Sequence, residues 1–383
     1  MRGHGLMASI QKRPDGKYRA RYRDDAGKEH AKHFTRKVDA QQWLDEKTAA
    51  IVTGQYVDPK AGKVTFANYF ADWSQRQLWA PGTDKAMRLA ARSVTFASVE
   101  LRALRRSHIE QWVKAMQTAD RGEGKTRGLA PGTIKTRFNN VRAVLRAAVR
   151  DRMIPSDPSE GVALPRRRRA EAAMAMPTPA QVRALLNAAG PRFVAFVALA
   201  AFAGLRLGEA AGVRVGDVNF LGRNLQVARQ VQRGPGGTVV ISPPKYGSER
   251  TIFLAPALVE LLARHVAEHR PGEDAQRWLF EGEPGDPPHQ NTVGYWWRKA
   301  CRDAGVAGFT LHDLRHYYAS GLIAQGCDVV TVQRALGHAN AAVTLKTYSH
   351  LWPTAEDRTR KAAAALMAET LNRPADSLRT REA

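Results

Sequence analysis

The alternation of apolar and polar positions in residues 1–60 predicts a small β unit followed by one helix. Two turn signals, Asp15-Gly16 and Asp25-Ala26-Gly27, enclose a segment of strict alternation. A helix should begin with Thr35 as its cap and bury Trp43. Because side chains alternate between the two faces of a strand, one face of the alternating segment carries Tyr18, Ala20 and Tyr22, and the other carries Arg19, Arg21 and Arg23.

Helical periodicity dominates residues 64–154. Thr65 is expected to cap a helix whose aromatic side chains recur at helical spacing, as core residues do. Ser107 and Glu110 match a capping box that would begin a further helix. In residues 131–151 one stripe of the predicted helix is apolar, and a different face carries a row of arginines. This part of the chain predicts an all-α domain.

The next segment, 155–176, is predicted to be a linker because it is rich in proline and contains four consecutive arginines, which cannot pack in a core. Thr178 followed by Pro179 then marks the start of a helix and of a new domain. An apolar run in that domain, 193–203, has the length of a buried core helix, and β-rich stretches follow it. The chain is therefore predicted to be a multidomain α+β protein with five parts: a unit of three strands and a helix (1–60), an all-α domain (64–154), a basic linker (155–176), a mainly α domain with a small antiparallel sheet (177–365) and a C-terminal tail (366–383).

Composition indicates what such a chain binds. Its 383 residues include 59 Lys and Arg against 36 Asp and Glu, a net charge of +23. Like charges repel in a compact fold, so this excess favours a polyanionic partner. Nucleic acid is preferred to an anionic membrane as that partner. No apolar run reaches the ~18 residues of a membrane span. Two cysteines, Cys301 and Cys327, are too few for a disulfide framework, which favours a reducing cytoplasm.

Three sets of arginines are candidates for DNA contact. Residues 61–175 carry 22 basic and 10 acidic side chains, the strongest excess in the chain, which suggests that this part follows the DNA backbone. The sets on the predicted strand and helix could instead be ordinary solvated faces, and a run of four arginines is usually disordered in isolation. In a chain this basic we favour DNA contact, and the candidates are Arg19, Arg21 and Arg23 on the predicted strand, Arg142, Arg146 and Arg150 on the predicted helix, and Arg166, Arg167, Arg168 and Arg169 in the linker.

The polar residues between His312 and Tyr348 suit phosphate chemistry. His312 and Arg315 share one helical face at i, i+3. A guanidinium can bind two phosphate oxygens, and histidine can move protons near neutral pH. His338 adds a hydrogen-bond donor and Tyr348 adds a phenol. A buried core histidine beside a surface arginine is the alternative, which the density of polar groups makes the weaker one.

Two upstream sites complete the candidate chemistry. Arg206 lies between two glycines with Glu209 three residues later, and Lys245 lies in a predicted turn, where it could move a proton. Alone, the first could be a helix-capping turn with a surface ion pair, and the second an ordinary solvated lysine.

A zinc site is the alternative for the histidines. His312 and His316 are spaced as in part of a zinc site, but the zinc-protease pattern needs glutamate where this chain has Asp313. The two cysteines show no paired metal-ligand spacing. No metal is therefore expected.

In this order and at these separations, the motifs closely resemble those of the tyrosine recombinases, or phage-type integrases. The resemblance covers nearly the whole chain. It implies an arm-type DNA-binding unit, a SAM-like core-binding domain and a catalytic domain, in a nucleoid-associated protein of the bacterial cytoplasm. Ala203 is a departure, because the family often has threonine there. The resemblance rests on five ordered boxes: Arg206 with Glu209, Lys245, His312 with Arg315, His338, and Tyr348.

The resemblance implies a mechanism of strand cleavage. Tyr348 would attack the scissile phosphate, forming a 3′-phosphotyrosyl bond and freeing a 5′-hydroxyl. A phenol has a pKa of about 10, so it needs a proton acceptor, and His312 is the expected base. Arg206 and Arg315 would hold the nonbridging oxygens, and Lys245 would protonate the leaving oxygen.

The resemblance also implies partners and the absence of cofactors. His338 would donate a hydrogen bond to the phosphate, and Glu209 would orient its neighbours. Neither a metal nor another cofactor would be needed. Four active sites on two duplexes imply a homotetramer on double-stranded attachment sites, with an accessory DNA-bending or directionality factor as a further possible partner. An apolar helix after Pro353 could dock on a neighbouring subunit or on its own domain.

Two other functions use similar features. A noncatalytic DNA-binding protein could share the scaffold, but it would not need Tyr348 together with the arginines and histidines. A type IB topoisomerase uses similar chemistry, and the arm-like N-terminal unit favours an integrase over it.

Overall fold

The computed structural model divides the chain into two compact units, residues 1–173 and 174–383. The polyarginine run is only partly covered: Arg166 is exposed, whereas Arg167, Arg168 and Arg169 lie outside the described residues. The structure describes residues 8–24, 27–53, 56–58, 61–119, 128–166, 176–283, 285–352 and 355–371.

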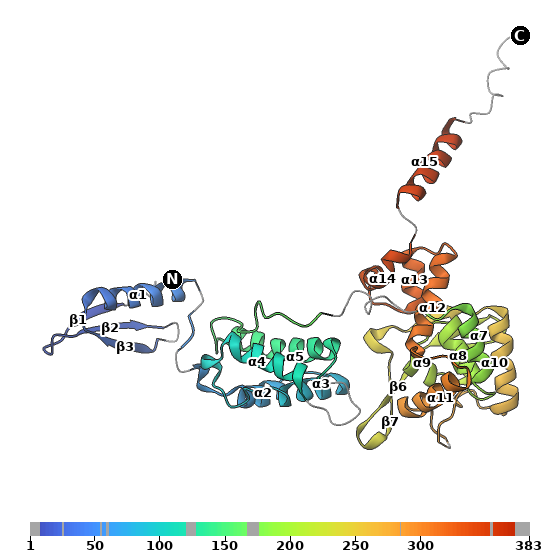
Figure 1. The fold of residues 1–383 in the computed structure, drawn as a ribbon, viewed down its shortest axis with the longest axis horizontal. Helices are drawn as coiled ribbons and strands as arrows, with labels where there is room; N and C mark the ends of the chain where they lie inside the picture. Colours follow the sequence, from blue (N-terminus) through green and yellow to red (C-terminus); the bar gives the residue numbers. More distant parts are fainter. Residues whose placement is uncertain are drawn as a thin grey trace, which may run out of the picture. The chain divides into compact units, whose positions relative to one another are not determined.

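The N-terminal part is an antiparallel sheet covered by one helix (Figure 1, blue). The predicted alternation is confirmed, because Ala20 and Tyr22 are buried against the helix while Arg23 is exposed. The helix begins one residue later than predicted, because its N-cap is Arg36 and not Thr35. The elements are β1 (Ser9–Lys12), β2 (Tyr18–Arg23), β3 (Glu29–Phe34) and α1 (Lys37–Val52).

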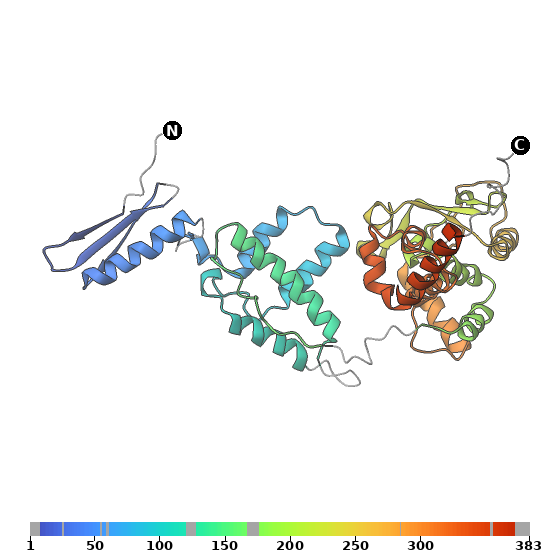
Figure 2. The same ribbon diagram turned by 90° about the horizontal axis from the view of Figure 1, so that it is seen from above.

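A helical domain follows (Figure 2). It has its own hydrophobic core. The predicted cap at Thr65 is confirmed, because its hydroxyl accepts a hydrogen bond from the Asn68 amide at 3.3 Å. The capping box predicted at Ser107 is wrong. The helix begins two residues earlier than predicted, with Arg105 as its N-cap, and the Arg105 amide donates to His108 Nδ1 at 3.1 Å. The helices are α2 (Phe66–Gln75), α3 (Pro81–Arg92), α4 (Arg106–Thr118) and α5 (Pro131–Arg150).

The segment predicted as a linker begins as part of this helical domain. Ile154 is buried in the helical core, and Val162 and Leu164 pack against it. Asp157 forms ion pairs with arginines of α5. The chain therefore stays on the helical domain at least ten residues beyond the boundary predicted at residue 154.

The second unit is built around a helix that is buried on nearly all sides. This helix, α8, packs against α7, α10 and α12, and its residues 195–201 are all buried. The predicted cap at Thr178 is confirmed, since its hydroxyl accepts from the Gln181 amide at 3.2 Å. The helices of this core are α7 (Pro179–Ala188), α8 (Val194–Phe202), α9 (Leu207–Ala211), α10 (Pro256–His269), α11 (Gln290–Asp303) and α12 (Leu311–Ala324).

Small antiparallel sheets lie beside these helices, which agrees with the predicted α+β class. One sheet has the order β4-β5-β8, and the other is the hairpin β6-β7. The segment between β7 and β8 passes from one sheet to the other and carries Lys245 in a 3-10 turn, Lys245–Gly247. The strands are β4 (Val218–Asn219), β5 (Asn224–Val227), β6 (Gln230–Arg233), β7 (Val239–Ser242) and β8 (Arg250–Phe253).

The end of the chain adds a second, small core in which Tyr348 is buried. It is formed where α12 meets α13 (Val329–Leu336), α14 (Ala341–Tyr348) and the turn Ser349–Leu351. A last helix, α15 (Ala355–Leu371), continues across the boundary predicted at residue 365. In the described part of the chain, no helix is both long and apolar enough to cross a membrane.

Candidate active site

Glu209 is the buried centre of a cluster of arginines. Its carboxylate accepts hydrogen bonds from Arg206 Nη1 at 2.5 Å and from Arg250 Nη2 at 2.8 Å. Burial by itself raises the pKa of Glu209, but the hydrogen bond and charge of Arg250, with the charge of Arg206, lower it to about 2. The carboxylate is therefore ionised at neutral pH and holds both guanidinium groups.

The turn between α8 and α9 positions Arg206. Gly204 has a φ of +63°, and a Cβ there would lie 2.5 Å from the Tyr318 ring, so glycine is required. Arg206 is the N-cap of α9, and Glu209 accepts from its backbone amide at 3.0 Å. The guanidinium also donates to the Gly337 carbonyl at 3.2 Å. With 24% of its side chain exposed, Arg206 can still reach a ligand from solvent.

Arg315 is enclosed by two helix ends. It lies on α12, is only 1% exposed, and donates hydrogen bonds to the carbonyls of Gly204 and Leu336. These carbonyls lie at the C-terminal ends of α8 and α13, where a helix lacks partners of its own. Burial and the charge of Arg206 lower the pKa of Arg315 to about 9, so the group stays charged at neutral pH. Three arginines thus lie around one carboxylate, an excess of positive charge that suits an anion.

The turn after α13 contacts the arginine cluster. Gly337 has a φ of +61°, and a Cβ there would lie 2.7 Å from Arg250 Nη1. His338 follows, and its Nδ1 shares a hydrogen bond of 2.9 Å with the Thr344 hydroxyl. Burial and the nearby positive charges, that of Arg315 first, lower the pKa of His338 to about 4, so the imidazole is neutral at pH 7.

Tyr348 ends α14 and is 1% exposed. Its hydroxyl lies 2.6 Å from Nδ1 of His316. Burial raises the pKa of Tyr348 to about 12, although the charge of Arg315 acts in the opposite direction. Burial also lowers the pKa of His316 to about 4. At neutral pH the phenol is therefore protonated and donates to a neutral imidazole.

His312 and Lys245 are connected to the cluster through other residues, His312 through His316 and Lys245 through the turn that leads to Ser248. The His312 ring meets the His316 ring edge to face, with centroids 4.7 Å apart. Burial and the charge of Arg315 lower the pKa of His312. Lys245 is exposed on its turn, and Ser248 just beyond it accepts a hydrogen bond from Arg206 at 3.5 Å. The structure thus brings the predicted residues of four boxes together in the second unit, and Lys245 lies three residues before Ser248 on the adjoining turn.

Three residues of this region were not assigned a catalytic role from the sequence. Arg250 follows the lysine turn and binds Glu209, and its Nε donates to the Ala335 carbonyl at 3.1 Å. Thr344 holds His338, and His316 holds Tyr348. His316 was noticed only as half of a metal pair. No spacing rule along the chain connects these residues to their partners, because each contact joins separate elements.

A group with metal-like spacing lies elsewhere, in the N-terminal part. Among the described residues, only Asp24, His30 and Asp58 bring three ligand atoms within 4.8 Å of one another. His30 Nε2 pairs with Asp24 at 2.7 Å, and the Lys28 ammonium pairs with Asp58 at 2.6 Å. These contacts connect members of the group through ion pairs, one of them to the Lys28 ammonium. His312 and His316 do not belong to such a group.

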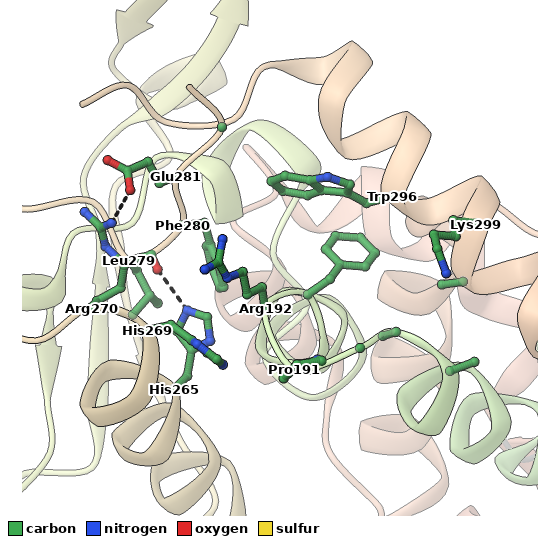
Figure 3. Close-up of a pocket in the computed structure, with 16 residues that line it drawn as sticks. Pro191, Arg192, His265, His269, Arg270, Leu279, Phe280, Glu281, Trp296 and Lys299 are labelled. Atoms are coloured by element: carbon green, nitrogen blue, oxygen red, sulfur yellow. Dashed lines mark hydrogen bonds and ion pairs between the residues drawn. The ribbon is translucent and has the colours of Figure 1, made fainter. Parts of the chain in front are cut away.

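The second unit also contains a cavity of about 650 Å³ between the α7–α8 turn, α10 and α11 (Figure 3). Arg270 is paired there with Glu281, and His265 Nε2 shares a hydrogen bond of 3.0 Å with the Leu279 carbonyl. The lining includes none of the residues predicted to be catalytic. This cavity is therefore separate from the arginine cluster.

The arginines of β2 already have partners. Arg19 and Arg23 lie 3.6 Å and 3.9 Å from Glu29, and Arg21 donates to the Ser9 hydroxyl at 2.8 Å. The side chains of Arg19 and Arg23 are 41% and 54% exposed. Such exposed ion pairs contribute little to stability, so they would not prevent DNA contact.

The arginine row of α5 also has an acidic partner, which sequence reading did not find. Asp157 lies 3.3 Å from Arg142 and 3.6 Å from Arg146. Arg150 is exposed. One carboxylate between two arginines leaves the row with a net positive charge.

Comparisons with known families show which family the chain resembles. Residues 177–354 match the phage integrase family, and residues 8–53 match the phage integrase N-terminal domain. A putative prophage phiRv2 integrase of Mycobacterium tuberculosis is 25% identical over 363 residues, covering 92% of each chain. The ICEBs1 integrase of Bacillus subtilis is 27% identical, covering 42% of this chain and 45% of its own.

Solved structures share the fold. The Tn1549 transposon integrase in complex with circular intermediate DNA superposes with a TM-score of 0.64 at 19% identity, covering 79% of this chain and 99% of its own. A lambda integrase tetramer bound to a Holliday junction gives a TM-score of 0.54 at 17% identity, covering 88% and 97%. The fold is that of these integrases, and the family matches define the class of protein, a recombinase that acts on DNA. The chain belongs to the phage integrase family, the tyrosine-type site-specific recombinases.

Proposed function

We propose that Tyr348 cuts DNA at a specific site by forming a 3′-phosphotyrosyl bond and that the strand is then rejoined to a new partner. The observation that carries this proposal is the arrangement of Arg206, Arg250 and Arg315 around the single carboxylate of Glu209, close to a buried phenol. A phosphodiester supplies the negative charge that this cluster lacks. The elements moved would be a prophage or another mobile element, as in the named relatives.

Each group has one task in this scheme. Arg206 and Arg315 stabilise the charge that develops on the nonbridging oxygens, as donors of an oxyanion hole do. His338 binds the phosphate through Nε2, because its Nδ1 is engaged with Thr344. Lys245 protonates the 5′-oxygen as it leaves. The covalent bond conserves the energy of the broken phosphodiester, so the residues need no nucleotide cofactor or metal for this step.

DNA binding is assigned to the basic parts upstream. Residues 1–60 act as the arm-type binding unit through Arg19, Arg21 and Arg23. The helical domain that begins at residue 64 acts as the core-binding domain through Arg142, Arg146 and Arg150. The arginines 166–169 follow the backbone between the core-binding domain and the catalytic domain at 177–365. Contacts of this kind weaken as salt rises, because bound cations are released from DNA.

The assembly is proposed to be a homotetramer on two attachment sites, in the bacterial cytoplasm. Strand exchange between two duplexes needs four cleavages, and so four copies of the site. The exposed apolar residues of α15, Leu366, Met367 and Leu371, suit contact with a neighbouring copy. An accessory DNA-bending or directionality factor belongs to the same proposal.

Trapping on nicked DNA tests the function. The parent protein should form a covalent adduct with a substrate whose nick lets the 5′-fragment diffuse away. Tyr348→Phe should form none and should bind the same DNA with unchanged affinity. Tyr317→Phe, on α12, is the matched control and should be trapped like the parent. An equal yield of adduct from Tyr348→Phe would refute the proposal. Joining two different sites, rather than only relaxing supercoils, separates a recombinase from a topoisomerase.

A further inference from the structure

We propose that His316 accepts the proton of Tyr348 when the phenol attacks DNA. The inference rests on the proposed function, since it takes Tyr348 as the nucleophile. Sequence reading assigned this task to His312, one helical turn earlier on α12. The geometry of the site points to His316 instead.

The contact between the two side chains is direct. The Tyr348 hydroxyl donates to His316 Nδ1 at 2.6 Å, within the range over which a general base takes a proton. The two rings pack at a tilt of 63°, with centroids 5.6 Å apart. His312 instead packs against the His316 ring, with the two ring centroids 4.7 Å apart. It is therefore placed to orient the base, or to pass its proton on.

The groups around His316 keep its imidazole neutral, so that it can accept a proton. The titratable groups that face it are His312, Asp313 and Arg315 of α12 and Tyr348 of α14. Burial lowers the pKa of His316 to about 4, so its Nδ1 lone pair is available at neutral pH. Such a ring is too weak a base to ionise the resting phenol, whose pKa is about 12. The proton must therefore move while the oxygen–phosphorus bond forms, when the phenol becomes strongly acidic.

The step balances in atoms and charge. The Tyr348 oxygen forms a bond to phosphorus, and the bond from phosphorus to the 5′-oxygen breaks. The phenolic proton goes to His316, which becomes an imidazolium, and the Lys245 ammonium gives a proton to the leaving oxygen. Asp313 stabilises the imidazolium electrostatically. Rejoining runs the same transfers backwards, with His316 protonating the phenolate that departs.

The test compares single-turnover cleavage of nicked DNA at saturating protein. His316→Asn places an amide oxygen near the position of Nδ1, so it keeps the hydrogen bond but cannot take a proton. We expect its rate to fall about 100-fold or more, the usual contribution of a general base. Its rate should also rise tenfold per pH unit between pH 7 and pH 9, because the phenol must then ionise into solvent, whereas the parent should vary less. His350→Asn, at an exposed histidine close to Tyr348, is the matched control.

The outcomes separate this inference from the proposed function. A His316→Asn rate within threefold of the parent, or an unchanged pH slope, would overturn the role of His316. A larger loss in His312→Asn than in His316→Asn would return the task to His312. Covalent adduct formed by Tyr348→Phe would instead overturn the proposed function. A melting temperature matching the parent's shows that His316→Asn is folded, and His316→Gln provides a second variant if it is not.

Discussion

Arg250 and Glu209 form a buried ion pair, with Arg250 Nη2 2.8 Å from Glu209 Oε2 and the two side chains 8% and 0% exposed. Removing one partner of such a pair leaves an unpaired charge away from water. We expect Glu209→Gln to lower the free energy of unfolding by about 3 kcal/mol in urea titrations. Glu260→Gln, at an exposed position of α10, should change it by less than about 0.5 kcal/mol. Equal stabilities for the two variants would contradict this prediction.

Gly337→Ala should affect both stability and cleavage. The new Cβ would lie 2.7 Å from Arg250 Nη1 on a backbone whose φ is +61°. Gly326→Ala is the control for backbone strain alone, because Gly326 has a φ of +88° and nothing within 4 Å of a Cβ. The control should lose about 1 kcal/mol of stability and keep its cleavage rate. Gly337→Ala should lose more and cleave at least tenfold more slowly, since Arg250 must move.

Lys245→Ala should slow strand cleavage about 100-fold, because the leaving 5′-oxygen would depart without a proton. Replacing that oxygen by sulfur in the DNA should restore most of the rate, since a thiolate leaves without protonation. Arg206→Ala should not be rescued in this way, as it acts on the nonbridging oxygens. Cleavage rates measured with both substrates test the assignment, and a Lys245→Ala rate that sulfur leaves unchanged would exclude it.

Acidification should destabilise the second unit between pH 7 and pH 5. The pKa values of His265, His312, His316 and His338 are lowered in the folded protein, to about 4 for the last two. The unfolded chain then binds more protons than the folded one, so stability is complete above pH 6.5 and falls toward pH 4. Glu209 contributes little between pH 7 and pH 5, because its pKa falls from the ordinary value of 4.5 to about 2 on folding, so its contribution is lost only below about pH 4.5.

The denaturant midpoint across this pH range checks the prediction. His316→Asn, which removes one of the four groups, should show a shallower fall than the parent. A midpoint that stays constant from pH 7 to pH 5 would show that these histidines titrate alike in the folded and unfolded chains.

Deleting the chain after Pro353 should reduce the size of the complex that joins two DNA sites. The reason is the loss of α15, whose exposed Leu366, Met367 and Leu371 are proposed to contact a neighbouring copy. Light scattering of the assembled complex measures the change. Replacing these three residues by glutamine is the milder variant and should act in the same direction. A complex of unchanged size would place α15 on its own domain.

Much of this architecture could be predicted from the sequence because local patterns determine it. Strict alternation placed Tyr22 and Ala20 in the core of the N-terminal sheet, and Thr65 and Thr178 marked two helix starts. The error at Ser107 has a physical cause. A histidine side chain, His108 at the third helical position, accepts from the N-cap amide, a role that the capping-box rule expects from glutamate or glutamine.

The contacts that complete the site could not be predicted in this way. Arg250 meets Glu209, and His316 meets Tyr348, only after separate elements pack together. Sequence motifs indicated which residue types were present, whereas the partner of each side chain depends on that packing. The same reason explains why Asp157 was not recognised as a counterion of Arg142.

The position of Arg315 between the ends of α8 and α13 changes how its variants must be interpreted. Its guanidinium joins the Gly204 carbonyl, two residues before Arg206, to the Leu336 carbonyl, two residues before His338. One side chain therefore fixes the spacing of two distant parts of the chain that are proposed to bind the same phosphate. An inactive Arg315 variant would report the loss of that spacing as well as the loss of a charge. Only a variant in which Arg206 and His338 keep their positions would measure the charge alone.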